Sequence, residues 1–325
     1  MKQTLKSKGC GLVLSAIVIF CHDAFAQGFP QKPIRLIVPS AAGGSTDTIS
    51  RIIAQKLAGD IGATVVVENR PGGGGNLGAD VVAKSPPDGY ALVMVYAGHA
   101  VNATLYPKLA YDLVKDLDPV IQVCMVASML VVHPSLPVRS VKELIALAKA
   151  KPGVLNYASS GTGNISHLAG ELFRNLTGAQ IVHVPYRGTG PALIDVLGGQ
   201  VPMMFPNMPG TMQHVQAGRL RVLGVNSEKR SALLPDVPTV AEAGVRGFEA
   251  STWFGLLAPA GTPREVIVRL NAATARVLNT ADVNERFSSE GATAVGGPPE
   301  QFGAFIKSEI AKWGKVVRAS GARVD

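Results

Sequence analysis

Short runs of apolar residues alternate along the chain with segments in which apolar residues recur every three or four positions. The runs IRLIVP (34–39), TVVVE (64–68) and YALVMVY (90–96) predict buried strands, whereas the apolar positions between residues 49 and 57 fall on one helix face. The same alternation resumes with a predicted helix at VKELIALAKA (141–150). Strands separated by helices are typical of βαβ units, so we expect an α/β protein whose sheets are mostly parallel and flanked by helices.

Two segments interrupt this alternation. PVIQVCMVASMLVVHP (119–134) is too long and too rich in β-forming residues for one ordinary strand, and STWFGLLAPAGTP (251–263) is an extended apolar run. If both segments cross between two sheets, the chain forms two lobes joined by paired crossings. We therefore expect lobe one to comprise residues 27–130 and 255–325, and lobe two residues 131–254. Ligands bind between the lobes of such hinged proteins.

The first 26 residues have the layout of a secretory signal. Three lysines precede the apolar run GLVLSAIVIF (11–20), and Ala24-Phe25-Ala26 forms a small-x-small cleavage site. The apolar run is shorter than the ~20 residues that a spanning helix requires. We expect cleavage after Ala26 and a periplasmic protein.

Composition narrows the classes of function. The net charge of +8 is spread along the chain without a basic run, which disfavours nucleic acid as a partner and favours small anions. Loss of the signal would leave Cys124 as the single cysteine, and its apolar surroundings predict a buried residue without a disulfide.

A glycine-rich segment, VVVENRPGGGGNLGAD (65–80), contains the pattern G-x-G-x-x-G at Gly73, Gly75 and Gly78. In a dinucleotide site the first glycine follows the strand directly and an acidic residue stands about 20 positions later. Here four residues intervene, and VYAG (95–98) carries no carboxylate. We interpret the segment as a turn that leads into a helix near Leu77, and we expect no cofactor.

Two other glycine loops stand directly between a predicted strand and a predicted helix, VPSAAGGSTD (38–47) and YASSGTGNISH (157–167). Glycines allow a ligand to approach the backbone, and a helix N-terminus presents unpaired N–H groups and a positive dipole end. Two such loops in corresponding positions indicate a site for a carboxylate or phosphate group.

Several residues of these loops have alternative interpretations. For Asp47 a role as a helix cap is favoured over contact with a ligand. Asn164 and Ser166 are also expected to be caps. Ser159, Ser160 and Thr162 have no evident capping role, which leaves ligand contact and a purely structural role equally open. The same two interpretations remain open for Arg187, which follows the predicted strand QIVHVPY.

Catalytic and metal sites are less well supported. Ser159 or Ser160 with His167 and Asp195 would compose a serine hydrolase triad, but the G-x-S-x-G elbow is missing. The histidines show no HExxH motif or ligand-type pairing, so we expect no metal. His99 follows a strand at the end where ligands bind, so it is a further candidate for contact with a ligand in the cleft. An exported hydrolase is the alternative function.

The chain resembles the substrate-binding proteins of tripartite tricarboxylate transporters, the Bug family of periplasmic receptors. The segments that carry this resemblance follow the family's order over essentially the whole chain after residue 26: PIRLIVPSAAGGSTDTISR, VVVENRPGGGGNLGADVVAKSPPDGYAL, LNYASSGTGNISHLAGELF, VPYRGTGPALIDVLGGQV, AGRLRVLGVNSEKRSALLPDVPTVAEAG and APAGTPREVIVRLN. The resemblance implies a two-lobed Venus-flytrap fold without catalytic activity, which binds a small organic acid.

The resemblance also implies which residues of this chain contact the ligand. The first loop would supply Ser40, Ala41, Gly43, Gly44 and Asp47. The second loop would supply Ser159, Ser160, Gly161, Thr162, Gly163 and His167, and Tyr186 and Arg187 would line the far wall. The partners it implies are a small organic acid and either a membrane permease or a sensor kinase, and we expect a monomer.

This chain departs from the family pattern at several positions. Ser40 stands where an aromatic residue is common, no acidic residue occurs near Pro202 or Pro206, and Arg187 replaces a common lysine. A small residue at position 40 changes the shape of the pocket, so the ligand of another family member cannot be transferred. The planar guanidinium of Arg187 can hold a second carboxylate through two hydrogen bonds.

Overall fold

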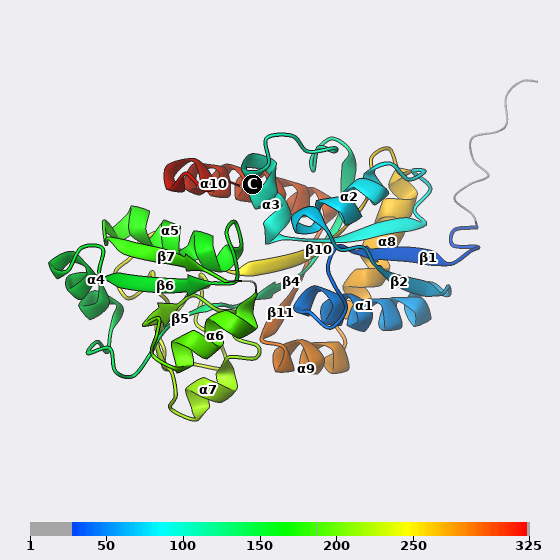
Figure 1. Cartoon of the computed structure of the whole chain (residues 1–325). Helices are drawn as coiled ribbons and strands as arrows, with labels where there is room; N and C mark the ends of the chain where they lie inside the picture. Colours follow the sequence, from blue (N-terminus) through cyan, green and yellow to red (C-terminus); the bar gives the residue numbers. More distant parts are fainter. Residues whose placement is uncertain (1–27, 187, 324–325) are drawn as a thin grey trace, which may run out of the picture.

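Strands and helices alternate through most of the chain and form two mixed sheets flanked by helices, as Figure 1 shows. The computed structural model describes residues 28–186 and 188–323. The expected signal segment and Arg187 lie outside these residues. No helix in the described part of the chain is long and apolar enough to cross a membrane.

Lobe one contains a six-stranded sheet in the order β11-β4-β10-β3-β1-β2. Its strands are β1 (Ile34–Val38), β2 (Val65–Asn69), β3 (Ala91–Tyr96), β4 (Leu117–Val126), β10 (Thr252–Pro259) and β11 (Ala292–Gly296). Its helices are α1 (Ser45–Ile61), the short η1 (Gly73–Gly75), α2 (Asn76–Ala83), α3 (Ala97–Leu105), α8 (Arg264–Leu278), α9 (Ala281–Ser289) and α10 (Pro299–Ser320).

Lobe two contains a five-stranded sheet in the order β7-β6-β8-β5-β9. Its strands are β5 (Met129–Val132), β6 (Leu155–Ser159), β7 (Ile181–Pro185), β8 (Met203–Met204) and β9 (Arg221–Val225). Its helices are α4 (Val141–Ala150), α5 (Ile165–Thr177), α6 (Thr189–Leu197) and α7 (Met212–Gln216).

The sheets are mixed, which differs from the expectation of mostly parallel sheets. The βαβ units give parallel pairs, β1 with β2 and β3, and β6 with β7 and β8. The strands at the crossings run the other way: β10 is antiparallel to β3 and β4, and β5 is antiparallel to β8 and β9. A strand that returns from the other lobe enters its sheet from the opposite end, and the periodicity of the sequence does not reveal that direction.

The two crossing segments are tied to each other where they pass between the lobes. Between β4 and β5, Ser128 donates a hydrogen bond from its Oγ to the carbonyl of Ala250, 2.9 Å away. Asn226, just after β9, donates from Nδ2 to Ser128 Oγ at 2.7 Å. Both side chains are buried. These buried hydrogen bonds between side chains and backbone hold the two crossings together.

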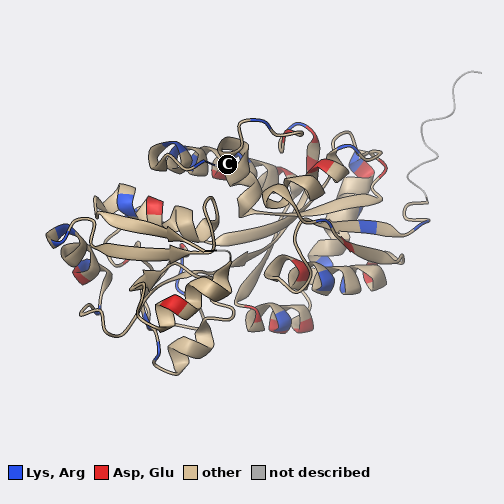
Figure 2. Ribbon diagram, in the orientation of Figure 1, with Lys and Arg blue, Asp and Glu red and all other residues tan. Residues whose placement is uncertain are grey.

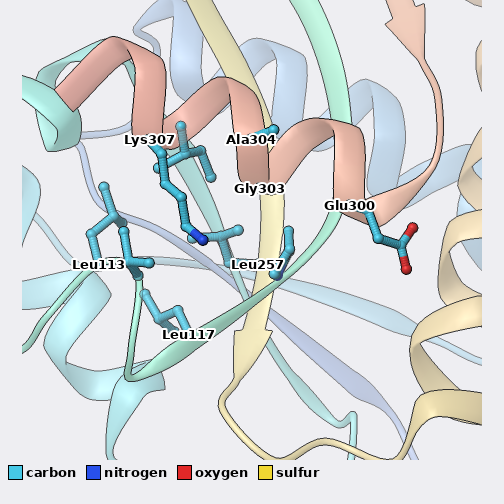
Figure 3. Close-up of a pocket in the computed structure, with 10 residues that line it drawn as sticks. Leu113, Leu117, Leu257, Glu300, Gly303, Ala304 and Lys307 are labelled. Atoms are coloured by element: carbon cyan, nitrogen blue, oxygen red, sulfur yellow. The ribbon is translucent and has the colours of Figure 1, made fainter. Parts of the chain in front are cut away.

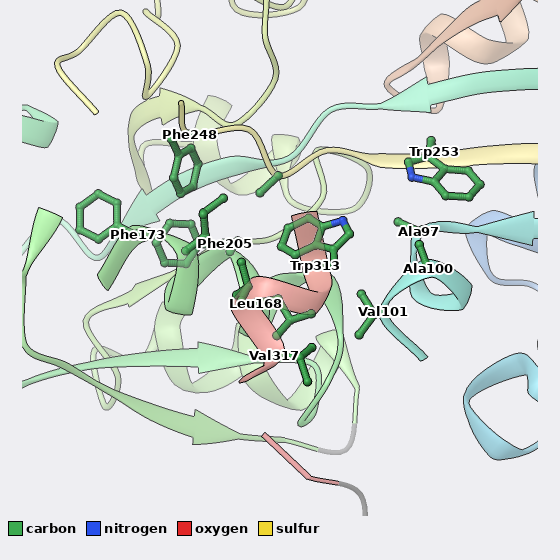
Figure 4. Close-up of a cluster of buried hydrophobic side chains, with 14 of the residues drawn as sticks. Ala97, Ala100, Val101, Leu168, Phe173, Phe205, Phe248, Trp253, Trp313 and Val317 are labelled. Atoms are coloured by element: carbon green, nitrogen blue, oxygen red, sulfur yellow. The ribbon is translucent and has the colours of Figure 1, made fainter. Parts of the chain in front are cut away.

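Helix α10 also connects the two lobes, in addition to the two crossing segments. Its first half packs on the sheet of lobe one, where Phe302 fills the space over Gly255, a position at which any Cβ would lie 2.1 Å from the ring. Its second half carries Trp313 and Val317 into a buried apolar cluster that includes Leu168 of α5, as Figure 4 shows. One hydrophobic core therefore runs from lobe one into lobe two.

Candidate ligand-binding site

The first candidate loop, residues 39–44, connects β1 to α1. Residues 41–44 are exposed, and Gly44 is extended at the N-cap position of α1 (φ −85°, ψ 169°). Among the described residues, the backbone N–H groups of Ala41, Ala42 and Gly44 have no hydrogen-bond partner. Unpaired donors at the start of a 17-residue helix have the chemistry that an anion requires, so the anion site that the sequence pattern indicates here stays a prediction.

Asp47 holds this loop in place. Its buried carboxylate accepts hydrogen bonds from Gly43 N (2.9 Å), Asn69 Nδ2 (2.9 Å) and Arg51 Nε (3.0 Å). Asn69 also donates to the carbonyl of Ser40. Burial opposes ionisation of Asp47, but the hydrogen bonds from Arg51, Gly43 and Asn69 outweigh it and lower the pKa to about 2. The carboxylate is thus ionised and hydrogen-bonded to the protein, and it holds the loop from the buried side.

The second candidate loop, residues 160–164, connects β6 to α5. Its N–H groups are largely used within the protein: Ser160 N donates to Ser166 Oγ (3.0 Å), Gly161 N to Ser159 Oγ (3.1 Å) and Gly163 N to His167 Nδ1 (3.1 Å). The N–H of Thr162 has no partner among the described residues, and Thr162 is exposed. Left-handed backbone at Gly161 (φ 132°) and Gly163 (φ 80°) makes this tight arrangement possible.

Two histidines lie behind the second loop. The rings of His167 on α5 and His183 on β7 stack with their centroids 3.9 Å apart and their planes inclined by 21°. His183 Nε2 lies 2.6 Å from the hydroxyl oxygen of the fully buried Ser159. Burial lowers the pKa of both imidazoles to about 4.

The second loop lies against lobe one. A Cβ built on Gly163 would lie 2.3 Å from Cδ2 of Leu105, the last residue of α3. The carbonyl of Gly74 accepts two hydrogen bonds from this region. Asn102 Nδ2 on α3 donates one at 3.0 Å, and the hydroxyl of Tyr96, just before α3, donates the other at 2.9 Å. The glycine run, α3 and the second loop therefore meet at the junction of the lobes.

The glycine run is a turn and not a nucleotide loop. Gly72 to Gly75 all have positive φ, and α2 begins directly afterwards at Asn76. His99 is fully buried beneath this run, with its ring 3.2 Å from the position of a Cβ on Gly75 and its Nδ1 accepting from Tyr96 N. His99 therefore packs beneath the glycine run, and its expected contact with a ligand stays a prediction.

Tyr186, just before α6, forms a pair with Asp195 in the second half of that helix. The half-buried Tyr186 donates its hydroxyl to Asp195 Oδ2 at 2.6 Å. Partial burial, then this bond to a carboxylate, raises the pKa of Tyr186 to about 12. Arg187, the next residue, lies outside the described residues, so its expected contact with a second carboxylate remains a sequence prediction.

The triad considered as an alternative is not assembled. Ser159 pairs with His183 instead of His167, Asp195 accepts from Tyr186, and no described carboxylate is hydrogen-bonded to His183. Among the described residues, no group of three or more His, Cys, Asp or Glu side chains is placed to hold a metal ion. Figure 2 shows Lys and Arg residues on helices of both lobes.

A separate cavity of about 350 Å³ lies in lobe one between α10 and residues 113–119, as Figure 3 shows. Leu113, Leu117 and Leu257 make it largely apolar, and Lys307 reaches over it. It contains no residue of either glycine loop, so it is not the candidate site.

Comparison with known proteins decides the family. Residues 49–322 match the model of the tripartite tricarboxylate transporter family receptor. The chain belongs to this family. It is 43% identical to protein BugT of Bordetella pertussis over 301 residues, which cover 92% of each chain. The match is to receptors, so the family is not one of enzymes and the hydrolase alternative is set aside.

Solved structures of similar receptors show the same fold. Rpa4515 of R. palustris, solved with adipate, is 39% identical and aligns with a TM-score of 0.79 over 91% of this chain and 99% of its own. MatC of Rhodopseudomonas palustris, solved with bound malate, is 33% identical with a TM-score of 0.75, over 89% of this chain and 100% of its own. The two-lobed α/β fold expected from the sequence is thereby confirmed.

Two residues that hold the candidate loops in place were not expected from the sequence. His183 and Asn69 were not singled out as site residues, although each stands on a strand beside the strand that leads into a candidate loop. The available signal was the register of parallel neighbours, since a polar residue near the carboxyl end of an adjacent strand reaches the same edge of the sheet.

Proposed function

We propose that this chain is an exported periplasmic receptor that binds a small dicarboxylate between its lobes and delivers it to a membrane permease. One carboxylate would bind the free N–H groups of loop 39–44 at the start of α1, and loop 160–164 would approach it from lobe two. The observation that carries this proposal is the set of unpaired donors at Ala41, Ala42 and Gly44. Two similar receptors were solved with dicarboxylates, adipate and malate, which supports the ligand class.

Titration calorimetry and thermal shift with the purified protein test the ligand class. We expect binding of at least one dicarboxylate from a series that includes malate and adipate, and no binding of the matching neutral diols. A ligand at 100 times its Kd should add about 2.7 kcal/mol to the free energy of unfolding. A protein that ignores every carboxylate of the series would contradict the proposal.

The variant Gly44→Leu tests the position of the carboxylate. A side chain at this position meets no atom closer than 3.9 Å, and the backbone there is extended, so the protein should fold normally. The leucine would cover the N–H groups that the anion needs, and we expect binding to be lost. Gly59→Leu, in the exposed and equally open part of α1, is the matched control. Unchanged binding by Gly44→Leu would place the carboxylate elsewhere.

Export is tested on the secreted protein itself. We propose cleavage after Ala26, and the mass of the protein isolated from the periplasm should correspond to a chain that begins at Gln27. A full-length mass would contradict this part of the proposal.

A further inference from the structure

The hydrogen bonds behind the second loop restrict which nitrogen of each histidine carries a proton. Ser159 Oγ accepts from Gly161 N and lies 2.6 Å from His183 Nε2, so its hydroxyl proton can point to that nitrogen. In this arrangement His183 Nε2 is the acceptor, and the ring proton is on Nδ1. His167 Nδ1 accepts from Gly163 N, so its ring proton is on Nε2, which faces Glu171 Oε1 at 4.0 Å.

The surroundings keep both rings neutral. Glu171 is buried and already paired with Arg174 (2.9 Å), and it also accepts from the hydroxyl of Tyr157 at 2.7 Å. After burial itself, the charge of Arg174 lowers the pKa of His167, and the neighbouring His167 lowers the pKa of His183 by more than Glu171 raises it. Each ring would also lose its acceptor nitrogen if it gained a proton.

We propose that His167 and His183 form a neutral pair that sets the conformation of loop 160–164 and are positioning residues for the ligand. They hold the N–H groups of Gly161 (through Ser159) and Gly163 inward, while the N–H of Thr162 has no partner within the described part of the chain. This inference rests on the proposed function for its effect on binding. Its effect on the loop is independent of any ligand.

The ligand-free protein tests the inference directly by ¹⁵N NMR of the imidazole rings and by amide hydrogen exchange at pH 7. We expect a proton on Nδ1 of His183, a proton on Nε2 of His167, and slow exchange at Gly161 and Gly163. A charged ring at pH 7 or the opposite tautomer at either histidine would overturn the inference.

Two variants separate the acceptor from the ring. His183→Phe keeps a flat ring that can stack on His167 but removes the acceptor, so the Gly161 amide should exchange about tenfold faster. His183→Gln retains an acceptor oxygen, so its Gly161 amide should exchange more slowly than that of His183→Phe. His214→Gln on α7, which lies outside both loops, is the control and should leave exchange at Gly161 unchanged. Equal exchange in His183→Phe and the wild-type protein would overturn the inference.

Binding of adipate, used as the probe together with malate, gives the functional arm. In His183→Phe we expect the Kd to rise about tenfold, with partial rescue in His183→Gln. A wild-type protein that binds neither probe counts against the proposed ligand class, while the NMR arm still decides on the histidine pair. A wild-type protein that binds while His183→Phe binds equally well overturns the inference alone.

Discussion

At the scale of single residues, the carboxylate of Asp47 determines the shape of the loop in front of α1. It accepts three hydrogen bonds from Gly43, Arg51 and Asn69 and is itself almost inaccessible to solvent. In Asp47→Asn the amide group faces donors and the charge is lost. We expect the free energy of unfolding to fall by about 2 kcal/mol, as measured by urea denaturation at pH 7.

The matched control for this change is Asp60→Asn at the other end of α1. Asp60 pairs with Arg276 through two hydrogen bonds on the surface, an arrangement that contributes little to stability. Equal losses in the two variants would show that burial of Asp47 has no role. In the wild-type protein, the contribution of Asp47 is present above its ordinary pKa of 3.8 and is lost as the pH falls toward 2.

The fully buried His99 makes stability depend on pH in a higher range. Burial lowers its pKa from 6.5 to about 4, so between these values the unfolded chain binds more protons and stability decreases as the pH decreases. The loss from this residue should reach about 3 kcal/mol at pH 4.

Urea midpoints measured between pH 7 and pH 4 check this expectation. His99→Gln should show a shallower decline than the wild-type protein, with the remaining slope due to His167 and His183, whose pKa values are lowered in the same direction. His214→Gln, on α7, should follow the wild-type curve. An unchanged slope in His99→Gln would contradict the assignment.

The sequence was sufficient to place the two loops between a strand and a helix, but it did not reveal the hydrogen-bond partners of their side chains. Glycines and hydroxyl residues between a strand and a helix predicted an anion site. Ser159 and His183 are 24 positions apart and meet only because β6 and β7 are parallel neighbours in register. For this reason Ser159 and His167 remain predictions as ligand contacts, while their observed bonds are to the loop itself.

At the scale of elements, α2 approaches the first loop closely because it carries glycine at position 78. A Cβ at Gly78 would lie 2.9 Å from Pro39 Cα and 3.0 Å from the carbonyl oxygen of Arg70. Since both are backbone atoms, Gly78→Ala must displace the helix or the loop. We expect a loss of about 2 kcal/mol in urea denaturation and weaker ligand binding.

Gly190→Ala in α6 provides the comparison, because its Cβ would meet no atom within 4 Å. Alanine has the higher helix propensity, so this variant should be as stable as the wild-type protein or slightly more stable. If Gly78→Ala is equally well tolerated, close packing is not the reason for glycine at position 78.

Element types were more predictable than sheet geometry. The helix expected at residues 141–150 is α4, and the apolar runs near residues 34, 64 and 90 are β1, β2 and β3. Periodicity reports which side of an element is buried, and these elements have clear periods. It does not report strand direction, which for β10 depends on where the chain returns from lobe two.

At the scale of the whole molecule, an ionic cluster around the buried Glu309 connects α10 to the crossing that leads into β10. Glu309 accepts from both indole nitrogens, Trp253 Nε1 at 2.8 Å and Trp313 Nε1 at 2.9 Å. Lys312 pairs with Glu309 at 2.9 Å and also with Glu249 on the crossing segment. Because α10 packs on both lobes, this cluster links the crossing to the helix that spans the junction.

Replacing Glu309 with leucine would leave two buried indole N–H groups without an acceptor and Lys312 with a single partner. Loss of one member of a buried ionic cluster costs about 3–5 kcal/mol, so we expect a decrease of this size in the free energy of unfolding. The chain has two tryptophans and both contact Glu309, so their fluorescence in urea reports on this junction directly. Glu300→Leu changes the same helix and removes only an exposed ion pair with Arg264, so its urea midpoint should stay close to that of the wild-type protein. Similar urea midpoints in the two variants would mean that the cluster does not stabilise the connection between α10 and the crossing.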